Sequence, residues 1–232
     1  MKKLSLLTVL ILLCACTFAQ NKSTISLSIG TTTPMGDFAS KDLDKTGAGF
    51  ANGGLLFDLK YSYKINNHFG ITAMLRRQNS PIDAQAYADE AAKLFSSGTV
   101  TINSTSWKIG GYMGGFNGNY PINDIFTLQG RALIGFLTAE SPELKFTLTD
   151  AGFTYWAKQN AATSSSFAYL FGAGLETKLS EKFVFLTNID YLGASPEFVG
   201  VETTNSLGEL STDTYSQDFA TITYSIGLGY KF

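Results

Sequence analysis

The residues of this chain that could do chemistry share one placement. They occur at alternate positions in runs whose other face is formed by Phe, Tyr, Leu and Ile. They are Asp58, Lys60, Arg76, Lys108, Gln129, Arg131, Glu176 and Asp190. Because buried charges need partners of opposite sign, we predict that these side chains form a paired network inside the molecule. An ion-pair gate over a narrow conducting path is the alternative.

His68 is the only histidine. Enzymes that cut or transfer acyl chains need a positioned histidine with a serine and often a carboxylate. His68 directly follows the turn residues Asn66 and Asn67, and no residue visibly completes such a set. We therefore predict that the protein is not an enzyme, and we assign no catalytic, cofactor-binding or metal-binding residue.

The elements that hold the charged residues are predicted to be strands, because apolar and polar residues alternate with a period of two. The eight runs are residues 24–31, 54–65, 68–77, 107–119, 126–136, 167–176, 183–191 and 221–232. Glycines blur the run 107–119, where we assign Trp107, Ile109 and Met113 to the apolar face and Lys108 to the polar one.

The connections between the runs alternate in length. Short turns at residues 66–67, 121–124 and 180–182 separate long connections at 34–53, 79–106, 139–166 and 193–218. In an antiparallel meander this pattern places every long connection at one end, as in outer-membrane barrels. We therefore predict an all-β fold, an eight-stranded antiparallel up-and-down transmembrane β-barrel. Its apolar face would meet lipid, and its polar face would fill the lumen with side chains.

Aromatic residues gather near the short turns, where amphipathic rings favour the membrane boundary. The predicted periplasmic girdle consists of Tyr61, Tyr63, Phe69, Phe126, Phe183, Tyr230 and Phe232. Arg77 has the same lipid-facing parity at the opposite end of its run, where it would reach lipid phosphate or mark the end of the membrane. The last run is predicted to pair with the first, since an open sheet edge is not tolerated in lipid.

Residues 1–19 have the basic start, apolar stretch and small-residue site of a cleaved signal peptide, which leaves 20–232 as the barrel domain. Lipid attachment at Cys16 is the alternative to cleavage after Ala19. Both cysteines precede Ala19, so no disulfide is expected in the mature chain. The 17 basic and 19 acidic residues give a formal charge of −2, which does not favour nucleic acid as a partner.

Three segments carry a family resemblance. SIGTTTPMGDFAS, AGFANGGLLFDLKYSYKINNHFGI and YSIGLGYKF resemble the small outer-membrane β-barrel domain proteins of Gram-negative bacteria, with OmpA- and OmpX-type architecture. The resemblance covers nearly all of the mature chain and implies a location in the bacterial outer membrane, in contact with its lipid. It also implies that Gly229, Tyr230 and Phe232 form the C-terminal signal read by the barrel assembly machinery. It includes no catalytic motif.

The long connections contain further patterns. Ser80 as N-cap, Asp83 in capping-box position and Gly98 as a stop predict a helix. Phe153, Tyr155 and Trp156 would form either loop packing or a binding patch. We predict an integral outer-membrane protein with a structural or surface-interaction role, which binds an extracellular ligand or protein at its loops. The alternatives are a narrow pore for small solutes and a secreted or lipid-anchored soluble β-barrel that binds an apolar ligand.

Overall fold

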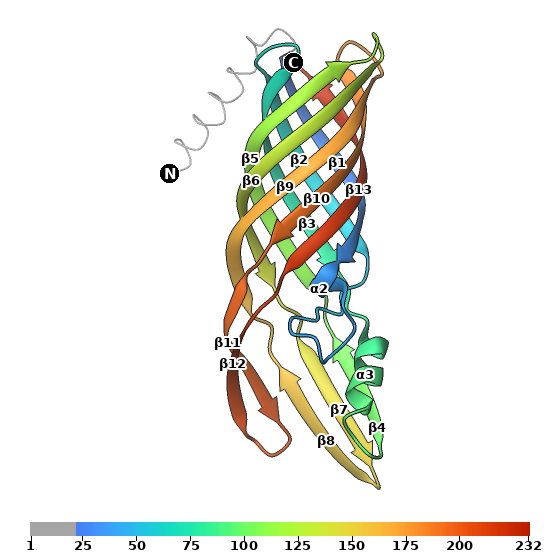
Figure 1. Ribbon diagram of the computed structural model, residues 1–232, viewed down its shortest axis with the longest axis vertical. Helices are drawn as coiled ribbons and strands as arrows, with labels where there is room; N and C mark the ends of the chain where they lie inside the picture. The colour runs from blue at the N-terminus through green and yellow to red at the C-terminus, as the bar shows by residue number, and fades with distance from the viewer. Residues whose placement is uncertain (1–21) are drawn as a thin grey trace, which may run out of the picture.

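The structure, a computed structural model, describes residues 22–232 and consists of a barrel with a folded extension at one end (Figure 1). Eight antiparallel strands close in the order β1-β13-β10-β9-β6-β5-β3-β2. They are β1 (Ser23–Met35), β2 (Gly54–Lys64), β3 (Phe69–Ser80), β5 (Trp107–Pro121), β6 (Phe126–Glu140), β9 (Thr163–Lys178), β10 (Phe183–Ala194) and β13 (Phe219–Lys231). The predicted eight-stranded up-and-down barrel is confirmed. The predicted signal peptide and Cys16 lie outside the described residues.

The barrel closes through its first and last strands. β1 and β13 pair along twelve residues, from Thr24 opposite Lys231 to Met35 opposite Ala220. Ser23 and Phe232 continue the ladder, because each backbone N–H donates to the carbonyl oxygen of the other at 3.1 and 2.9 Å. The closing pair therefore leaves no open edge in the barrel wall, as the alternation of residues 221–232 predicts.

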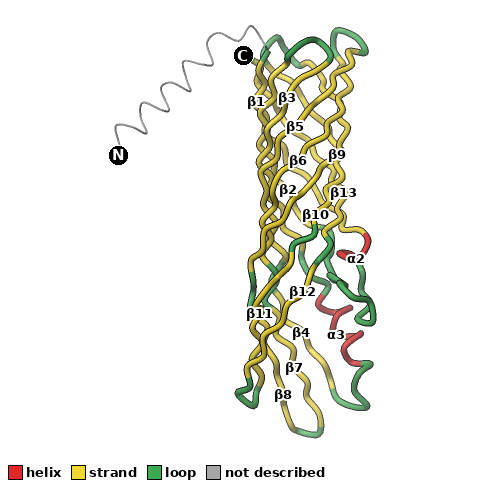
Figure 2. Tube along the Cα trace, turned by 60° about the vertical axis from the view of Figure 1, so that its left-hand side comes forward, coloured by secondary structure: helices red, strands yellow, loops and turns green. Residues whose placement is uncertain are grey.

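All three short turns lie at one end of the barrel, and all four long connections lie at the other (Figures 1 and 2). The strands contain 11 to 16 residues, whereas about 9–11 tilted residues suffice to cross the hydrocarbon. The strands are therefore long enough to continue beyond the membrane on the side of the long connections.

Near the short turns, the apolar side chains point outward. In β1, Leu27 and Ile29 are 51% and 58% exposed, whereas Ser26 and Ser28 between them are buried. In β13, Tyr224, Ile226 and Leu228 are exposed and Thr223 and Ser225 are buried. This is the inside-out arrangement that a lipid-facing wall requires.

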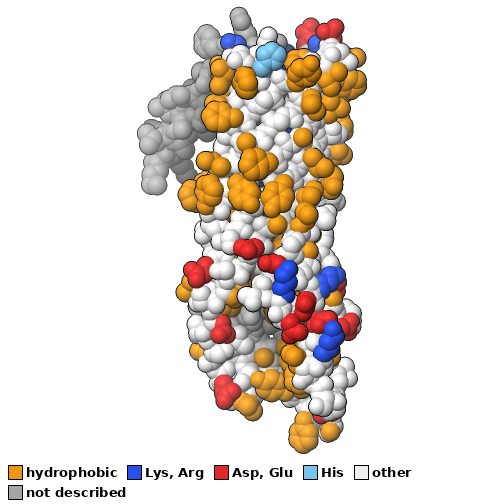
Figure 3. Space-filling view, viewed as in Figure 1, with side chains coloured by type: hydrophobic (Ala, Val, Ile, Leu, Met, Phe, Trp, Pro, Cys, Tyr) orange, Lys and Arg blue, Asp and Glu red, His pale blue; other side chains and the backbone are white. Residues whose placement is uncertain are grey.

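Near the long connections the arrangement reverses, with apolar side chains inside the barrel and charged ones outside. The predicted faces of the run 107–119 were therefore wrong. Trp107, Ile109 and Met113 point into the barrel and are buried, whereas Lys108 is exposed on the outer wall. β5 begins at Trp107, at the end of the barrel where charged side chains replace the hydrophobic ones on the outer surface (Figure 3). A wall surrounded by water buries its apolar face inward, which explains Trp107 and Ile109. Met113 points inward because the lipid-facing positions of β5 are those of Tyr112 and Phe116, which are exposed.

The long connections form a second sheet rather than irregular loops. Five strands pair in the order β12-β11-β8-β7-β4. They are β4 (Thr99–Ser104), β7 (Leu144–Asp150), β8 (Phe153–Gln159), β11 (Glu197–Asn205) and β12 (Leu210–Ser216). The β7–β8 turn uses Ala151 and Gly152 with positive φ angles of 46° and 85°, as a two-residue hairpin turn requires.

Two short helices complete the extension. α2 (Gly36–Ala39) follows β1, and α3 (Ala84–Ala92) lies in the second long connection. The predicted helix is present, but its N-cap is Asp83, whose carboxylate accepts from the Ala86 N–H at 3.1 Å. Ser80 instead ends β3, and its hydroxyl lies 3.3 Å from that of Thr32. No helix among residues 22–232 is both long enough and apolar enough to cross a membrane.

Candidate functional site: the barrel interior and its external end

The centre of the barrel holds an arginine clamped between two carboxylates. Arg76 donates from Nε and Nη2 to both oxygens of Asp58, at 2.8 and 2.7 Å. The same Nη2 donates to Asp190 Oδ2 at 2.7 Å. All three side chains are 1% exposed. A bidentate pair fixes the guanidinium plane, so this arrangement defines geometry as well as charge.

Asp190 also binds a second arginine. Arg131 donates from Nε to Asp190 Oδ1 at 2.7 Å and from Nη1 to Asn188 Oδ1 at 2.9 Å. Arg131 on β6 and Asp190 on β10 reach each other across β9, where Gly172 is the register partner of both. A Cβ at Gly172 would lie 1.9 Å from Asp190 Oδ1 and 2.8 Å from Arg131 Nε. The glycine therefore leaves the space in which the two side chains meet.

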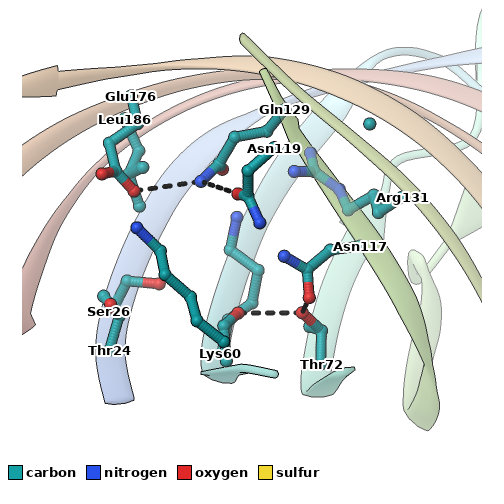
Figure 4. Close-up of a pocket in the computed structure, with 13 residues that line it drawn as sticks. Thr24, Ser26, Lys60, Thr72, Asn117, Asn119, Gln129, Arg131, Glu176 and Leu186 are labelled. Carbon is teal, nitrogen blue, oxygen red and sulfur yellow. Dashed lines mark hydrogen bonds between the residues drawn. The ribbon is translucent and has the colours of Figure 1, made fainter. Parts of the chain in front are cut away.

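A second polar layer lies closer to the short turns, at the ends of β6 and β9, and Figure 4 shows its residues Asn119, Gln129 and Glu176. Lys231 and Glu176 form an ion pair at 2.5 Å. Gln129 Nε2 donates to Glu176 Oε2 at 3.0 Å and to Asn119 Oδ1 at 3.2 Å. Glu176, Gln129 and Asn119 line a cavity of about 30 Å³ together with the basic residues Lys60, Lys64 and Arg131.

The external end of the barrel is filled by an apolar plug in place of polar groups. Phe38 of α2 packs edge-on against Trp107 and Phe219, with ring centroids 5.8 and 4.6 Å apart. Trp107 also contacts Phe198, and its Nε1 donates to the Gly49 carbonyl at 3.1 Å. Leu133, Leu137, Leu170 and Leu192 join this cluster from the barrel wall. The predicted polar lumen is therefore correct only for the half near the short turns.

The interior brings together most of the predicted charged residues. Asp58, Lys60, Arg76, Arg131, Glu176 and Asp190 are buried inside the barrel, and Gln129 is half-buried beside them. Lys108 does not join them, because it pairs with Glu140 at 2.7 Å on the outer wall. Sequence reasoning missed Asn188, Gly172 and Lys231. Asn188 and Lys231 have inward parity in their runs, but no sequence signal shows that Gly172 separates an ion pair.

The predicted girdle residues cluster at the short-turn end. Tyr61, Phe69, Phe126, Phe183 and Tyr230 are exposed, while Tyr63 and Phe232 are half-buried. The Phe232 ring lies 6.2 Å from that of Tyr230 and 6.5 Å from that of Tyr61. Gly229, whose inward face lies against Val184, precedes these rings in β13. The role of Gly229, Tyr230 and Phe232 as an assembly signal stays a prediction.

A second aromatic belt, which the sequence analysis did not identify, lies on five of the eight strands, next to the charged outer surface (Figure 3). Its exposed members are Phe57, Tyr112, Phe136, Phe167, Tyr169 and Tyr191. Tyr112 pairs with Phe136 at 6.0 Å between ring centroids. Arg77 is the register partner of Phe57, and Lys108 and Glu140 follow farther out. Aromatic rings next to a charged band are typical of the membrane–water boundary.

The extension contains a cleft of about 600 Å³. Tyr87, Trp107 and Tyr215 supply aromatic faces to it, and Gln159 and Gln217 supply amides. Burial raises the pKa of the Tyr87 hydroxyl, so this group stays a neutral hydrogen-bonding group at neutral pH. Lys45, Thr46, Thr214 and Ser216 add further polar groups, so the wall is mixed, and the volume is within the range of small-molecule sites.

The structure places the predicted helix and the aromatic residues of the long connections, as well as His68. Tyr87 of α3 packs on Phe50 at 4.5 Å between ring centroids, and Phe95 contacts Phe146 at 5.8 Å, so the helix face covers neighbouring connections. Phe153, at the tip of the β7–β8 hairpin, is 82% exposed. His68 is exposed at its turn, with Nδ1 3.4 Å from the Asn119 carbonyl oxygen. That the protein is not an enzyme stays a prediction.

Comparison with known proteins decides what kind of barrel this is. Residues 5–232 match the family described as outer membrane protein beta-barrel domain. The chain belongs to this family. Its place is therefore the bacterial outer membrane, where the apolar band between the two aromatic belts faces lipid.

Solved structures of outer-membrane barrels resemble this family member. A major outer membrane protein from Thermus thermophilus is 9% identical with a TM-score of 0.51, over 90% of this chain and 99% of that one. Ail of Yersinia pestis is 22% identical with a TM-score of 0.45, over 91% and 99%. The outer membrane protease OmpT from Escherichia coli is 9% identical with a TM-score of 0.45, over 90% and 96%. No curated protein matches the sequence. At these identities, the likeness to the Thermus protein establishes the fold alone.

Proposed function

We propose that this outer-membrane barrel is a closed anchor that presents its extension for binding at the cell surface. The observation that supports it best is the folded extramembrane sheet, which stands over a barrel blocked at two levels. A chain that served only to conduct would gain nothing from a blocked interior. A sheet with its own cleft and exposed tips offers a surface that a partner or ligand can contact.

The charge of the extension limits the chemistry of its partner. Residues 36–53, 81–109, 138–166 and 194–218 contain 14 Asp and Glu residues and six Lys residues, and the last of these segments contains no basic residue at all. This surplus disfavours a polyanionic partner, because like charges facing each other across an interface oppose binding. We infer a neutral or basic partner that meets exposed apolar tips such as Phe153, Leu207 and Leu210.

A narrow pore for small solutes is the second candidate, and two features speak against it. The Arg76 and Arg131 ion pairs cross the centre of the interior. The Phe38–Trp107–Phe219 plug fills the external end independently of those charges. We also propose that the barrel assembly machinery reads the C-terminal Gly229, Tyr230 and Phe232, which the exposed ring of Tyr230 at the end of β13 supports.

Site-specific photo-crosslinking on intact cells tests the proposed surface role. A crosslinking residue replaces Phe153 at the external hairpin tip, and a control chain carries it at Glu181 in a short turn. We expect a discrete crosslinked partner at position 153 and a different pattern at 181. Equal products at both positions, or none at 153 and at Leu207 of the neighbouring connection, would contradict a surface-binding role.

A further inference from the structure

The barrel interior carries more positive than negative charge. Its inward-facing basic residues are Lys60, Lys64, Arg76, Arg131 and Lys231, and its acidic ones are Asp58, Glu176 and Asp190. Lys231 pairs with Glu176, while Arg76 and Arg131 pair with the two aspartates. Within a membrane-spanning wall, charge without a partner is costly. The interior therefore lacks negative charge at a definable place.

That place is Lys60, because Lys64 is only half-buried at the short-turn end of β2, whereas Lys60 is buried. Its residue exposure is 5%, and its Nζ donates only to Asn188 Oδ1, at 3.3 Å. The same amide oxygen accepts from Arg131 at the shorter distance of 2.9 Å. Among residues 22–232, no carboxylate lies within 4.0 Å of Lys60 Nζ. Lys60 is thus a buried amine with one shared, neutral acceptor, and its charged form needs an anion beside it.

The small cavity beside Lys60 offers donors and few free acceptors (Figure 4). The Asn119 amide nitrogen in its wall is buried and has no hydrogen-bond partner. Both oxygens of Glu176 are already used by Lys231 and Gln129, and Asn117 Oδ1 accepts from Thr72 at 3.1 Å. Lys64 and Arg131 also line the cavity, so its wall carries more basic and donor groups than free acceptors and is suited to an anion.

We propose that this cavity binds a small inorganic anion of the chloride class, with Lys60 as its charged ligand and the Asn119 amide as a second donor. A site for one water needs roughly 10–15 Å³, so the cavity of about 30 Å³ admits a single monatomic ion but no organic solute. The ion supplies the missing negative charge next to the lysine. It is a structural counterion, held apart from the extension that carries the proposed surface function.

The ion reaches the site from the side of the short turns. Thr24 and Lys64, which line the cavity, lie at the short-turn ends of β1 and β2. On the other side, the paired arginines and then the apolar plug separate the cavity from the extension. Anion exchange should therefore follow the composition of the periplasmic side.

Thermal unfolding of the refolded full-length barrel in uncharged detergent tests this site. Sodium chloride is compared with sodium gluconate at equal ionic strength, because gluconate is too large for the cavity. We expect chloride to raise the unfolding midpoint of the wild type with a saturating dependence, as mass action requires of a ligand bound to the folded state. Lys60→Met and Asn119→Ala should weaken or abolish the rise. Lys108→Met, which removes a paired lysine on the outer wall, should keep it.

A direct measurement covers the case in which the Lys60 variants fail to fold. Crystals of the wild-type barrel grown or soaked in bromide should show an anomalous peak between Lys60 Nζ and Asn119 Nδ2. A cavity that holds water alone, with no bromide peak, would overturn the proposal. So would a chloride-induced rise that is absent in the wild type or equal in Lys60→Met. None of these results bears on whether the extension binds a partner.

Discussion

Arg76 and Asp190 join opposite walls of the barrel. Their strands, β3 and β10, are four places apart in the closed ring of eight, so the 2.7 Å bond from Arg76 Nη2 to Asp190 Oδ2 crosses the full width of the interior. Asp58 holds the same guanidinium from the neighbouring strand β2. Strands that are far from adjacent in the wall are thus tied together through one side chain.

Replacing Arg76 by Met should destabilise the barrel strongly. The substitution removes the positive charge that Asp58 and Asp190 share in the buried interior. Breaking a buried ion pair typically costs about 3–5 kcal/mol. Urea unfolding of the refolded barrel in detergent or vesicles measures the change. The control is Lys108→Met, which breaks an exposed pair and should cost less than about 1 kcal/mol. Equal losses in the two variants would show that the central pairs contribute no more than a surface pair.

Gly172→Ala should weaken the same network without removing a charge. The new Cβ would overlap Asp190 Oδ1 and crowd Arg131 Nε, so the two side chains must separate or the strands must shift. Overpacking of this kind costs typically about 1–3 kcal/mol. Gly130→Ala is the matched control, because a Cβ there meets no atom within 4 Å. Unfolding midpoints in urea compare the two, and a Gly172 variant as stable as the Gly130 variant would contradict the steric argument.

Single-channel recording in planar bilayers separates a closed anchor from a gated pore. We expect no conductance from the wild type, and none from Arg131→Ala, because the plug at the external end does not depend on Arg131. Discrete openings in Arg131→Ala but not in the wild type would instead establish the ion pair as a gate. Refolding is verified in each sample by the difference in gel migration before and after boiling.

The sequence predicts which side chains face lipid far better than which side chains pair inside the barrel. Alternation defines each strand because lipid demands an unbroken apolar face, and this rule places Leu27 outside and Asp58 inside. The rule fails at Trp107 and Lys108, where the strand leaves the membrane and water reverses the preference. Parity cannot show which charges meet across the lumen, since the Arg76–Asp190 contact depends on closure and register. The β7–β8 and β11–β12 hairpins were missed because their runs are short and lie in segments with no sustained apolar face.

Helix α3 should respond to acid through Asp83. The hydrogen bond from Lys41 and then that from the Ala86 N–H hold the pKa of Asp83 below its ordinary value. A lowered folded-state pKa means that the ionised cap stabilises the helix above the ordinary pKa near 4, and this support is lost as pH falls through the lowered value. Hydrogen exchange of the α3 amides, corrected for intrinsic rates, should be flat from pH 7 to about 5 and rise below 4.

Two variants distinguish the role of Asp83 as helix cap from its ion pair with Lys41. Asp83→Ala removes the cap and should cost about 0.5–2 kcal/mol of local stability at neutral pH. Asp83→Asn keeps a capping oxygen, so it should cost less and abolish the acid dependence of α3. An acid response of α3 that survives in Asp83→Asn would contradict its assignment to Asp83.

Deleting Phe232 should impair assembly in cells more than folding in vitro. Phe232 completes the closing ladder with Ser23, and its ring contacts Tyr61 and Tyr230 on the outer wall. The deletion removes one pair of backbone bonds, whereas the proposed signal would be lost entirely. We expect a large drop in heat-modifiable barrel in the outer-membrane fraction but efficient refolding of the purified chain into lipid vesicles. Phe116→Ala, which trims a lipid-facing ring that is 71% exposed, controls for lost aromatic surface. If both variants fail equally in both assays, the residue acts through packing, and the proposed recognition of the C-terminus is wrong.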